Sequence, residues 1–301
     1  MTRPERAPVV ELRPRRSAAR AVLVALRPRQ WSKNLLLFAG ILFAAKLGDA
    51  TRWAEAAAIF VAYCAASSAA YLLNDLRDAA DDRLHPVKRH RPIARGELSA
   101  ERALVAAALL AAGALAIAAV LGFTSLLLLL GFVALQLAYS LGLKRIVLVD
   151  VAVIAGLFVV RAAAGAEAVS VPISGWLLLC TALLALFLGL AKRRGELVLV
   201  HADATPGRAA LGGYSLRLVD VLLDVVALAT GVAYTLYAVT AHTAWLALTV
   251  PFVAAGLARY LVLVHRHDLG EEPEHVLLSD RLILGAVAGW IVVAAVVLAS
   301  T

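Results

Sequence analysis

Long apolar segments recur along the whole chain and restrict its folds more than any other feature. Each segment holds close to 20 mainly apolar residues, about the length with which an α-helix crosses roughly 30 Å of hydrocarbon. The segments do not alternate apolar and polar residues at every second position, as the strands of a membrane β-barrel do. The sequence therefore predicts an all-α, polytopic membrane protein, a bundle of nine transmembrane helices at about residues 34–50, 53–74, 101–120, 124–142, 147–167, 172–191, 219–240, 244–264 and 282–300.

The composition agrees with a bilayer environment. Hydrophobic residues make up 62% of the chain, charged residues 17%, and the mean hydropathy is +0.85, which excludes an ordinary soluble domain. Cys64 and Cys180 lie inside apolar segments, and no C-x-x-C motif occurs. We therefore expect free thiols in the core and no zinc or iron–sulfur site.

The chain carries 29 Lys and Arg against 21 Asp and Glu, and membrane topology explains this excess better than nucleic-acid binding does. With nine helices, nearly all basic residues fall on the side of the N-terminus, and basic loops remain cytoplasmic. We expect a plasma-membrane protein with a cytoplasmic N-terminus, the lipid bilayer as a partner and no nucleic acid. Residues 1–20 are predicted to form a basic, disordered arm rather than a signal peptide, and residues 21–301 a single transmembrane domain. A G-x-x-x-G motif at 285–289 leaves a homo-oligomer open.

The densest charge follows the second apolar segment, in "LLNDLRDAADDRLHPVKRHRPIA" at residues 72–94. At 100° per residue, Asp75, Asp78 and Asp82 fall within about 60° of one another on a helix, flanked by Asn74 and Asp81. Three ionised carboxylates on one stripe repel each other unless a cation neutralises them. Oxygen ligands without His or Cys suit Mg²⁺, which commonly combines carboxylates with substrate phosphates. The spacing therefore favours a site for Mg²⁺ and a diphosphate.

A solvated helix end, with its aspartates paired to Arg77, Arg83 and Lys88, is the structural alternative. It does not explain the like-charged pair Asp78 and Asp82 at i and i+4. The basic run that follows supports the diphosphate site, because arginine forks suit phosphate oxygens. This run contains Lys88, Arg89, Arg91 and Arg95, and topology alone is the competing explanation for it.

Other polar residues lie inside or beside apolar segments. Asp150 and Arg161 share a helical face, and ionisable residues inside a span usually face the bundle interior and carry function. A satisfied interface carboxylate and an arginine that snorkels outward are the alternatives. Lys192 and Glu196 at i and i+4 could simply pair with each other. Lys33 and Asn34, where an apolar helix begins, could contact a lipid-borne phosphate.

These motifs resemble those of the UbiA superfamily of intramembrane prenyltransferases. The resemblance rests on N-D-x-x-D-x-x-x-D at 74–82 and "RPIARGELS" at 91–99, and it implies a nine-helix bundle with an aspartate-lined cavity facing the cytoplasm. General members carry a second aspartate-rich loop, whereas here only Asp150 lies in that region. Four stretches look more like the decaprenyl-phosphate phosphoribosyltransferase branch of actinobacteria: "RPRQWSKNLLLFAG", "YSLGLKRIVLVDVAVIAGLFVVRAAAGA", "AKRRGEL" and "EEPEHVLLSDR".

The branch implies a glycosyltransferase that moves 5-phosphoribose from phosphoribosyl pyrophosphate (PRPP) to a polyprenyl phosphate, with Mg²⁺, for cell-wall arabinan synthesis. Residues 21–301 would then be one catalytic domain, with Asp75, Asp78, Asp82 and Asp150 as catalytic residues and the first three as Mg²⁺ ligands. The implied substrate-binding residues are Lys33, Asn34, Asn74, Lys88, Arg89, Arg91, Tyr139, Lys144, Arg161, Lys192, Arg193 and Glu196.

Two other functions compete with this hypothesis. An ordinary prenyltransferase would keep Asp75 to Asp82 but use a prenyl diphosphate donor and an aromatic or haem acceptor, and the surplus of basic residues disfavours it. A transporter of polar solutes would need polar residues along a path across the bilayer, whereas the charge lies mostly on one face.

A phosphate nucleophile is already anionic, so the absence of an evident general base agrees with phosphoribosyl transfer.

Overall fold

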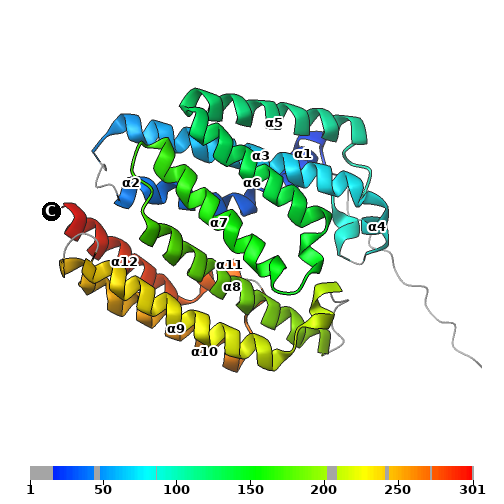
Figure 1. The fold of residues 1–301 in the computed structure, drawn as a ribbon. Coiled ribbons are helices and arrows are strands. Elements are labelled where there is room, and N and C mark those ends of the chain that lie inside the picture. Colours follow the sequence, from blue (N-terminus) through cyan, green and yellow to red (C-terminus); the bar gives the residue numbers. More distant parts are fainter. Residues whose placement is uncertain are drawn as a thin grey trace, which may run out of the picture.

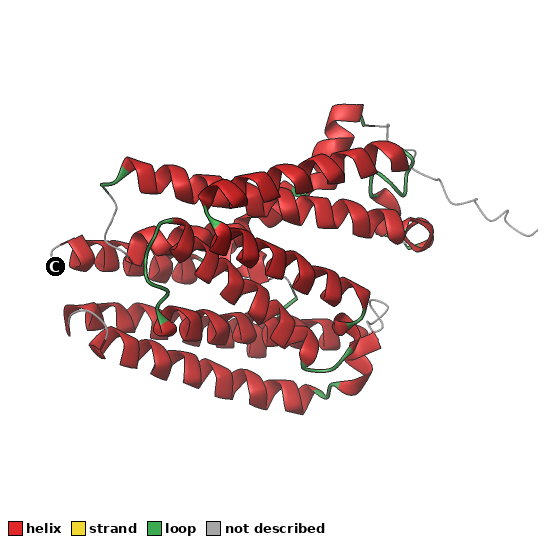
Figure 2. Cartoon of the chain, turned by 45° about the horizontal axis from the view of Figure 1, so that its top comes forward, coloured by secondary structure: helices red, strands yellow, loops and turns green. Residues whose placement is uncertain are grey.

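The chain folds into an all-α bundle whose longer helices run roughly along one direction (Figure 1). The structure is a computed structural model that describes residues 16–43, 48–85, 87–201, 209–240, 244–271 and 273–299. Within these ranges the secondary structure is helical throughout, without a strand (Figure 2). The α-helices are α1 (Ala18–Leu26), α2 (Ala39–Phe43), α3 (Ala50–Arg77), α4 (Ala79–Leu84), α5 (Ala100–Leu121), α6 (Phe123–Leu141), α7 (Val149–Ala168), α8 (Gly175–His201), α9 (Leu216–Thr240), α10 (Val250–His267), α11 (Pro273–Ser279) and α12 (Arg281–Ala299). The 3₁₀ segments are η1 (Pro28–Phe38), η2 (Lys88–His90), η3 (Leu143–Arg145), η4 (Ala209–Gly213) and η5 (Ala244–Thr249).

Six helices of the described residues are long and apolar enough to cross a membrane. They are α3, α5, α6, α7, α8 and the continuous segment of η5 with α10, whereas α12 is apolar but shorter. The first predicted span, residues 34–50, is not one helix, because η1 ends at Phe38, α2 covers only Ala39–Phe43 and residues 44–47 lie outside the described residues. The all-α membrane class is confirmed, and the count of nine crossings stays a prediction.

Two buried clusters hold the bundle together. One surrounds Leu37, Tyr63 and Phe132 and joins η1, α3, α6 and α7. The other surrounds Phe187, Leu223 and Tyr260 and joins α8, α9 and α10. Leucine and valine side chains that face outward stay exposed along α5, α9 and α12, which suits contact with lipid rather than water.

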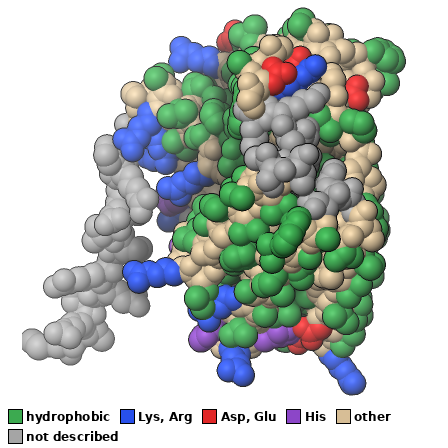
Figure 3. All heavy atoms as spheres, turned by 90° about the vertical axis from the view of Figure 1, so that its left-hand side faces the viewer, with side chains coloured by type: hydrophobic (Ala, Val, Ile, Leu, Met, Phe, Trp, Pro, Cys, Tyr) green, Lys and Arg blue, Asp and Glu red, His purple; other side chains and the backbone are tan. Residues whose placement is uncertain are grey.

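Charged loops gather at the end of the bundle that carries α4, where α3 ends and α7 begins (Figure 1). Figure 3 shows the opposite end, where hydrophobic and uncharged side chains cover most of the face and charged side chains lie mostly along its rim. The predicted residues of the α3–α4 junction and of the turn before α7 therefore lie at the same end, whereas Arg161 and Asn34 are buried within the bundle. Which side of a membrane this end faces stays a prediction.

The predicted N-terminal arm ends earlier than residue 20. Residues 1–15 lie outside the described residues, but α1 already begins at Ala18, because the Ser17 hydroxyl accepts the backbone N–H of Arg20 and caps the helix. The Arg16 guanidinium also pairs with Glu97 at 2.9 Å. Cys64 and Cys180 are free thiols, as expected.

The contact between η1 and α7 gives a test of the packing. A Cβ at Gly165 would overlap the carbonyl oxygen of Leu37. Gly165→Ala should therefore destabilise the fold by about 1–3 kcal/mol, the usual cost of overpacking. Gly113→Ala is the matched control, because a Cβ there meets nothing within 4 Å. Thermal unfolding in lipid nanodiscs measures both, and equal melting temperatures for the two variants would contradict the close approach.

Candidate active site

The predicted acidic stripe does not follow one helix. α3 ends at Arg77, Asp78 caps it with φ −89° and ψ 5°, and the short helix α4 begins at Ala79. The rotation of 100° per residue therefore does not extend from Asp75 to Asp82, which corrects the geometry expected from the spacing. Asp75 and Asp82 instead form a buried pair, and Asp78, Asp81 and Asp82 line a cavity.

Asp75 and Asp82 form the buried pair, with side chains only 2% and 3% exposed. The Arg91 guanidinium bridges them, because its Nη1 donates to Asp75 Oδ1 at 3.1 Å and to Asp82 Oδ2 at 2.7 Å. Arg27 also donates to Asp75, while its guanidinium lies 4.8 Å from the centre of the Tyr71 ring. Two cations thus neutralise two buried carboxylates and hold the loop after α4 against α3.

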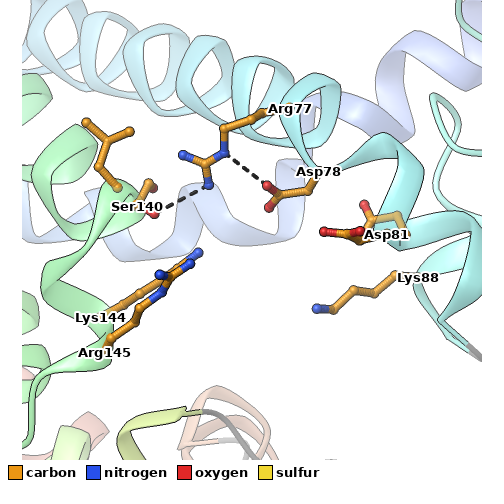
Figure 4. Close-up of a pocket in the computed structure, with 9 residues that line it drawn as sticks. Arg77, Asp78, Asp81, Lys88, Ser140, Lys144 and Arg145 are labelled. Carbon is orange, nitrogen blue, oxygen red and sulfur yellow. Dashed lines mark hydrogen bonds and ion pairs between the residues drawn. The ribbon is translucent and has the colours of Figure 1, made fainter.

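A charged cavity of about 390 Å³ lies beside this pair (Figure 4). One wall carries acidic residues of the α3–α4 junction with Lys88, and the other carries the end of α6 and the turn before α7. In Figure 4, Lys144 and Arg145 lie across the open space from Asp78, Asp81 and Lys88. The cavity is lined by Arg77, Asp78, Asp81, Asp82, Lys88, Ser140, Leu141, Lys144 and Arg145.

Asp78 is held at the cavity by two neighbours on its own helix. Arg77 Nε donates to Asp78 Oδ1 at 3.0 Å, and Asn74 Nδ2 donates to Asp78 Oδ2 at 3.0 Å. Burial raises the pKa of Asp78, but the Arg77 hydrogen bond and the charges of Arg77 and Lys144 outweigh it, so the pKa lies below its usual value. Asp78 therefore stays ionised at neutral pH, and an anionic ligand in the cavity needs a cation beside this carboxylate.

The donor chemistry of the cavity fits Mg²⁺ shared with a phosphate ligand. Asp78, Asp81 and Asp82 offer carboxylate oxygens, which Mg²⁺ prefers. Within the described ranges, no group of three or more His, Cys, Asp or Glu side chains is arranged to hold a metal ion by itself. A Mg²⁺ ion here would take the rest of its ligands from water and phosphate. Asp75, the first predicted ligand, does not line the cavity.

Asp150 is buried in a second polar cluster away from the cavity. Its side chain is 1% exposed, it accepts a hydrogen bond from the Tyr214 hydroxyl at 2.6 Å, and it lies 3.0 Å from Arg193 Nε. The contact with Arg193 is an ion pair without good hydrogen-bond alignment, because neither Asp150 Oδ2 nor Arg193 Nε has a hydrogen-bond partner. Arg193 also pairs with Glu196 and is 1% exposed, so neither Asp150 nor Arg193 faces the cavity.

Arg161 and Asn34 form a third buried cluster. Arg161 Nε donates to Asn34 Oδ1 at 2.7 Å, and the guanidinium lies 4.6 Å from the centre of the Phe132 ring. Asn34 Nδ2 donates in turn to the Cys64 sulfur at 3.2 Å. Arg161 therefore does not snorkel outward. The Asn34 amide is engaged inside the bundle, and its contact with a lipid phosphate stays a prediction.

The remaining predicted residues are spread over the charged end. Lys192 Nζ donates to the backbone carbonyl of Glu271 at 3.0 Å, and Glu196 pairs with Arg193. Lys33 and Tyr139 are partly buried, and Arg89 is exposed, but none of the three lines the cavity. The sequence predicts no substrate contact for Arg77, Arg145 or Ser140, although each adjoins a predicted residue, and no motif marks Tyr214. Arg77 pairs with Asp78, as the solvated-helix alternative expected.

The geometry can be compared with known proteins. The UbiA prenyltransferase family matches residues 35–279. The decaprenyl-phosphate phosphoribosyltransferase of Mycolicibacterium smegmatis is 35% identical over 295 residues, covering 92% of each chain. This chain belongs to the UbiA prenyltransferase family. It is an enzyme of the UbiA transferase family and a multi-pass membrane protein.

Other relatives agree with the family assignment. The decaprenyl-phosphate phosphoribosyltransferase of Corynebacterium glutamicum is 33% identical and covers 92% of this chain and 86% of its own. A UbiA homologue from Archaeoglobus fulgidus bound to DMAPP and Mg²⁺ superposes with a TM-score of 0.71 at 19% identity, over 93% of this chain and 99% of its own. The same homologue bound to GPP and Mg²⁺ gives a TM-score of 0.70, over 93% of this chain and 100% of its own. The UbiA fold is therefore confirmed.

The bridge made by Arg91 gives a second test. Arg91→Ala should destabilise the protein by about 2–3 kcal/mol, because it leaves Asp82 buried without its cation while Arg27 still neutralises Asp75. Arg89→Ala, which removes an exposed arginine two residues away, should change stability by less than about 0.5 kcal/mol. The measurement is the melting temperature in nanodiscs, and an unchanged value for Arg91→Ala would show that the bridge does not form.

Proposed function

We propose that this enzyme transfers 5-phosphoribose from PRPP to a polyprenyl phosphate such as decaprenyl phosphate and releases pyrophosphate. The observation that carries the proposal is the cavity with carboxylates on one wall and Lys144 and Arg145 on the other, because a diphosphate with Mg²⁺ needs both. The identity of 35% over 92% of both chains to a decaprenyl-phosphate phosphoribosyltransferase supports this choice of substrates.

The cavity residues bind and orient the donor in this proposal. Lys88, Lys144 and Arg145 bind phosphate oxygens of PRPP. Asp78 and Asp82 would hold Mg²⁺, with Asp81 beside them, and the ion would supply positive charge next to the leaving pyrophosphate. For Asp75 and Asp150 the proposal changes the predicted catalytic role, because neither residue lines the cavity. Each pairs with arginine and acts through the segments that these ion pairs hold in place.

The acceptor needs no general base. A polyprenyl phosphate oxygen is anionic near neutral pH and attacks the anomeric carbon of the ribose directly. The bond from that carbon to the pyrophosphate oxygen breaks, and pyrophosphate leaves with the electron pair. Attack from the face opposite the pyrophosphate predicts inversion at the anomeric carbon. The prenyl tail stays along the apolar helices, while the charged end of the bundle receives the soluble donor from the cytoplasm.

Transfer of a prenyl group is the second candidate function. The likeness to the A. fulgidus homologue bound to GPP and Mg²⁺ favours it, because one fold accommodates a prenyl diphosphate. Such a donor carries one diphosphate and no second phosphate group. The preference for PRPP therefore rests on the 35% identity, over 92% of both chains, to a decaprenyl-phosphate phosphoribosyltransferase.

A labelled-donor assay separates the two functions. Protein in nanodiscs is incubated with labelled PRPP, decaprenyl phosphate and Mg²⁺, and we expect label in the organic phase. Asp78→Asn should lower turnover at least about 100-fold, because an uncharged amide is a poor Mg²⁺ ligand. Asp224→Asn, which changes an exposed aspartate outside the cavity, should stay within about twofold of the wild type. Transfer from a labelled prenyl diphosphate to an aromatic acceptor, without transfer from PRPP, would select the other function.

Removal of the metal gives an independent test of the cavity. Excess EDTA should abolish transfer, and added Mg²⁺ should restore it, because the carboxylates otherwise repel the pyrophosphate. In the Asp82→Asn variant, half-maximal activity should require about tenfold more Mg²⁺, whereas Asp224→Asn should follow the wild-type titration. Full activity in EDTA would contradict a role for a divalent cation.

A further inference from the structure

The Tyr214 hydroxyl makes two hydrogen bonds that connect distant parts of the charged end. It donates to Asp150 Oδ1 at 2.6 Å and accepts the backbone N–H of Leu148 at 2.7 Å. Burial, followed by the hydrogen bond to Asp150, raises the pKa of Tyr214, so the hydroxyl stays protonated at neutral pH. The phenol therefore joins the segment after η4 to the start of α7.

Leu148 is in a conformation that a side chain disfavours. Its φ of 66° lies in the region that glycine occupies most easily, and its side chain is 45% exposed. Apolar packing therefore does little to hold this backbone, whereas the Tyr214 hydroxyl binds its amide directly. The neighbouring residue Val147 rests on Gly213, where a Cβ would overlap its methyl group.

Leu148 is the last residue of the turn that carries Lys144 and Arg145 at the wall of the cavity. The turn runs from Gly142 through η3 to Leu148, and its Lys144 and Arg145 form the wall opposite Asp78 (Figure 4). The position of these two cations thus depends on how the end of the turn is fixed. Asp150, which receives the Tyr214 hydrogen bond, is itself fixed by the ion pair with Arg193 of α8.

We infer that Tyr214 is a positioning residue, which fixes the 142–148 turn through the Leu148 amide and Asp150 and so sets Lys144 and Arg145 for a diphosphate ligand. That Tyr214 fixes the turn depends only on its hydrogen bonds to Leu148 and Asp150. The consequence for catalysis rests on the proposed function.

Tyr214→Phe tests the structural part without an activity assay. The substitution removes the hydroxyl and keeps the ring, which packs with Leu197, Leu211 and Val219. Tyr260→Phe is the matched control, because the Tyr260 hydroxyl is buried and has no hydrogen-bond partner. Limited trypsin digestion in nanodiscs reports on the turn, since trypsin cleaves after Lys144 and Arg145. We expect cleavage there to accelerate about five- to tenfold in Tyr214→Phe, the size of effect that losing one ordinary hydrogen bond gives, and to stay unchanged in Tyr260→Phe.

Cleavage after Arg266, at the exposed end of α10, serves as the internal reference and should not change. Equal protection of the turn in Tyr214→Phe and the wild type would overturn the inference. A uniform acceleration at all tryptic sites, with a lower melting temperature, would also overturn it, because it would show a general role in stability.

The effect of Tyr214 on diphosphate binding is measured by calorimetry and by enzyme kinetics. The dissociation constant for inorganic pyrophosphate with Mg²⁺, measured by calorimetry, and the KM for PRPP should both rise about tenfold in Tyr214→Phe while kcat changes less than about threefold. Loss of kcat at constant KM would overturn the positioning role. If the wild type transfers no phosphoribose, the proposed function fails, and the proteolysis result still decides whether Tyr214 fixes the turn.

Discussion

A carboxylate removed from water needs a positive partner, and the charged end of this bundle is built around that requirement. Asp75 and Asp82 are neutralised by Arg27 and Arg91, and Asp150 is neutralised by Arg193. Arg27 and Arg193 lie more than forty residues from their aspartates along the chain, whereas Arg91 lies 9 residues from Asp82 and 16 from Asp75. The ion pairs therefore do more than balance charge, because they tie η1, the loop after α4 and α8 to the helices that carry the aspartates. The loops of this end take their positions from these pairs.

The cavity differs from the buried pairs in that its cations and carboxylates come from separate segments and line one open space. Asp78 is engaged by Arg77 and Asn74, while Lys144 and Arg145 stand across open space from it (Figure 4). Unlike charges held apart in this way suit a ligand that carries both signs, such as a phosphate bound with a divalent cation. Asp75 and Asp150 hold the scaffold through their arginine partners, whereas Asp78, Lys144 and Arg145 line the cavity that is proposed to receive the donor.

The sequence predicted the membrane class, the UbiA fold and the gathering of polar residues at one end, because each follows from apolar length and local motifs. It predicted the acidic site but not its geometry, since α3 stops at Arg77 and the helical rotation cannot be extended through Asp78. It assigned Arg193 to substrate, although the structure buries this side chain against Asp150, because neighbours on α8 point in different directions. Tyr214 could not be found, since its partners Leu148 and Asp150 are more than sixty residues away along the chain.

The N-terminal segment is part of the same end of the molecule. Arg16 pairs with Glu97 and donates to the carbonyl of His90, and Arg27 reaches Asp75, so residues before the first long helix touch the loop that borders the cavity. The C-terminus, by contrast, lies at the other end of the bundle (Figure 1). A fusion partner joined directly before Arg16 would thus lie beside this loop, whereas one joined to the tail would lie at the other end of the bundle.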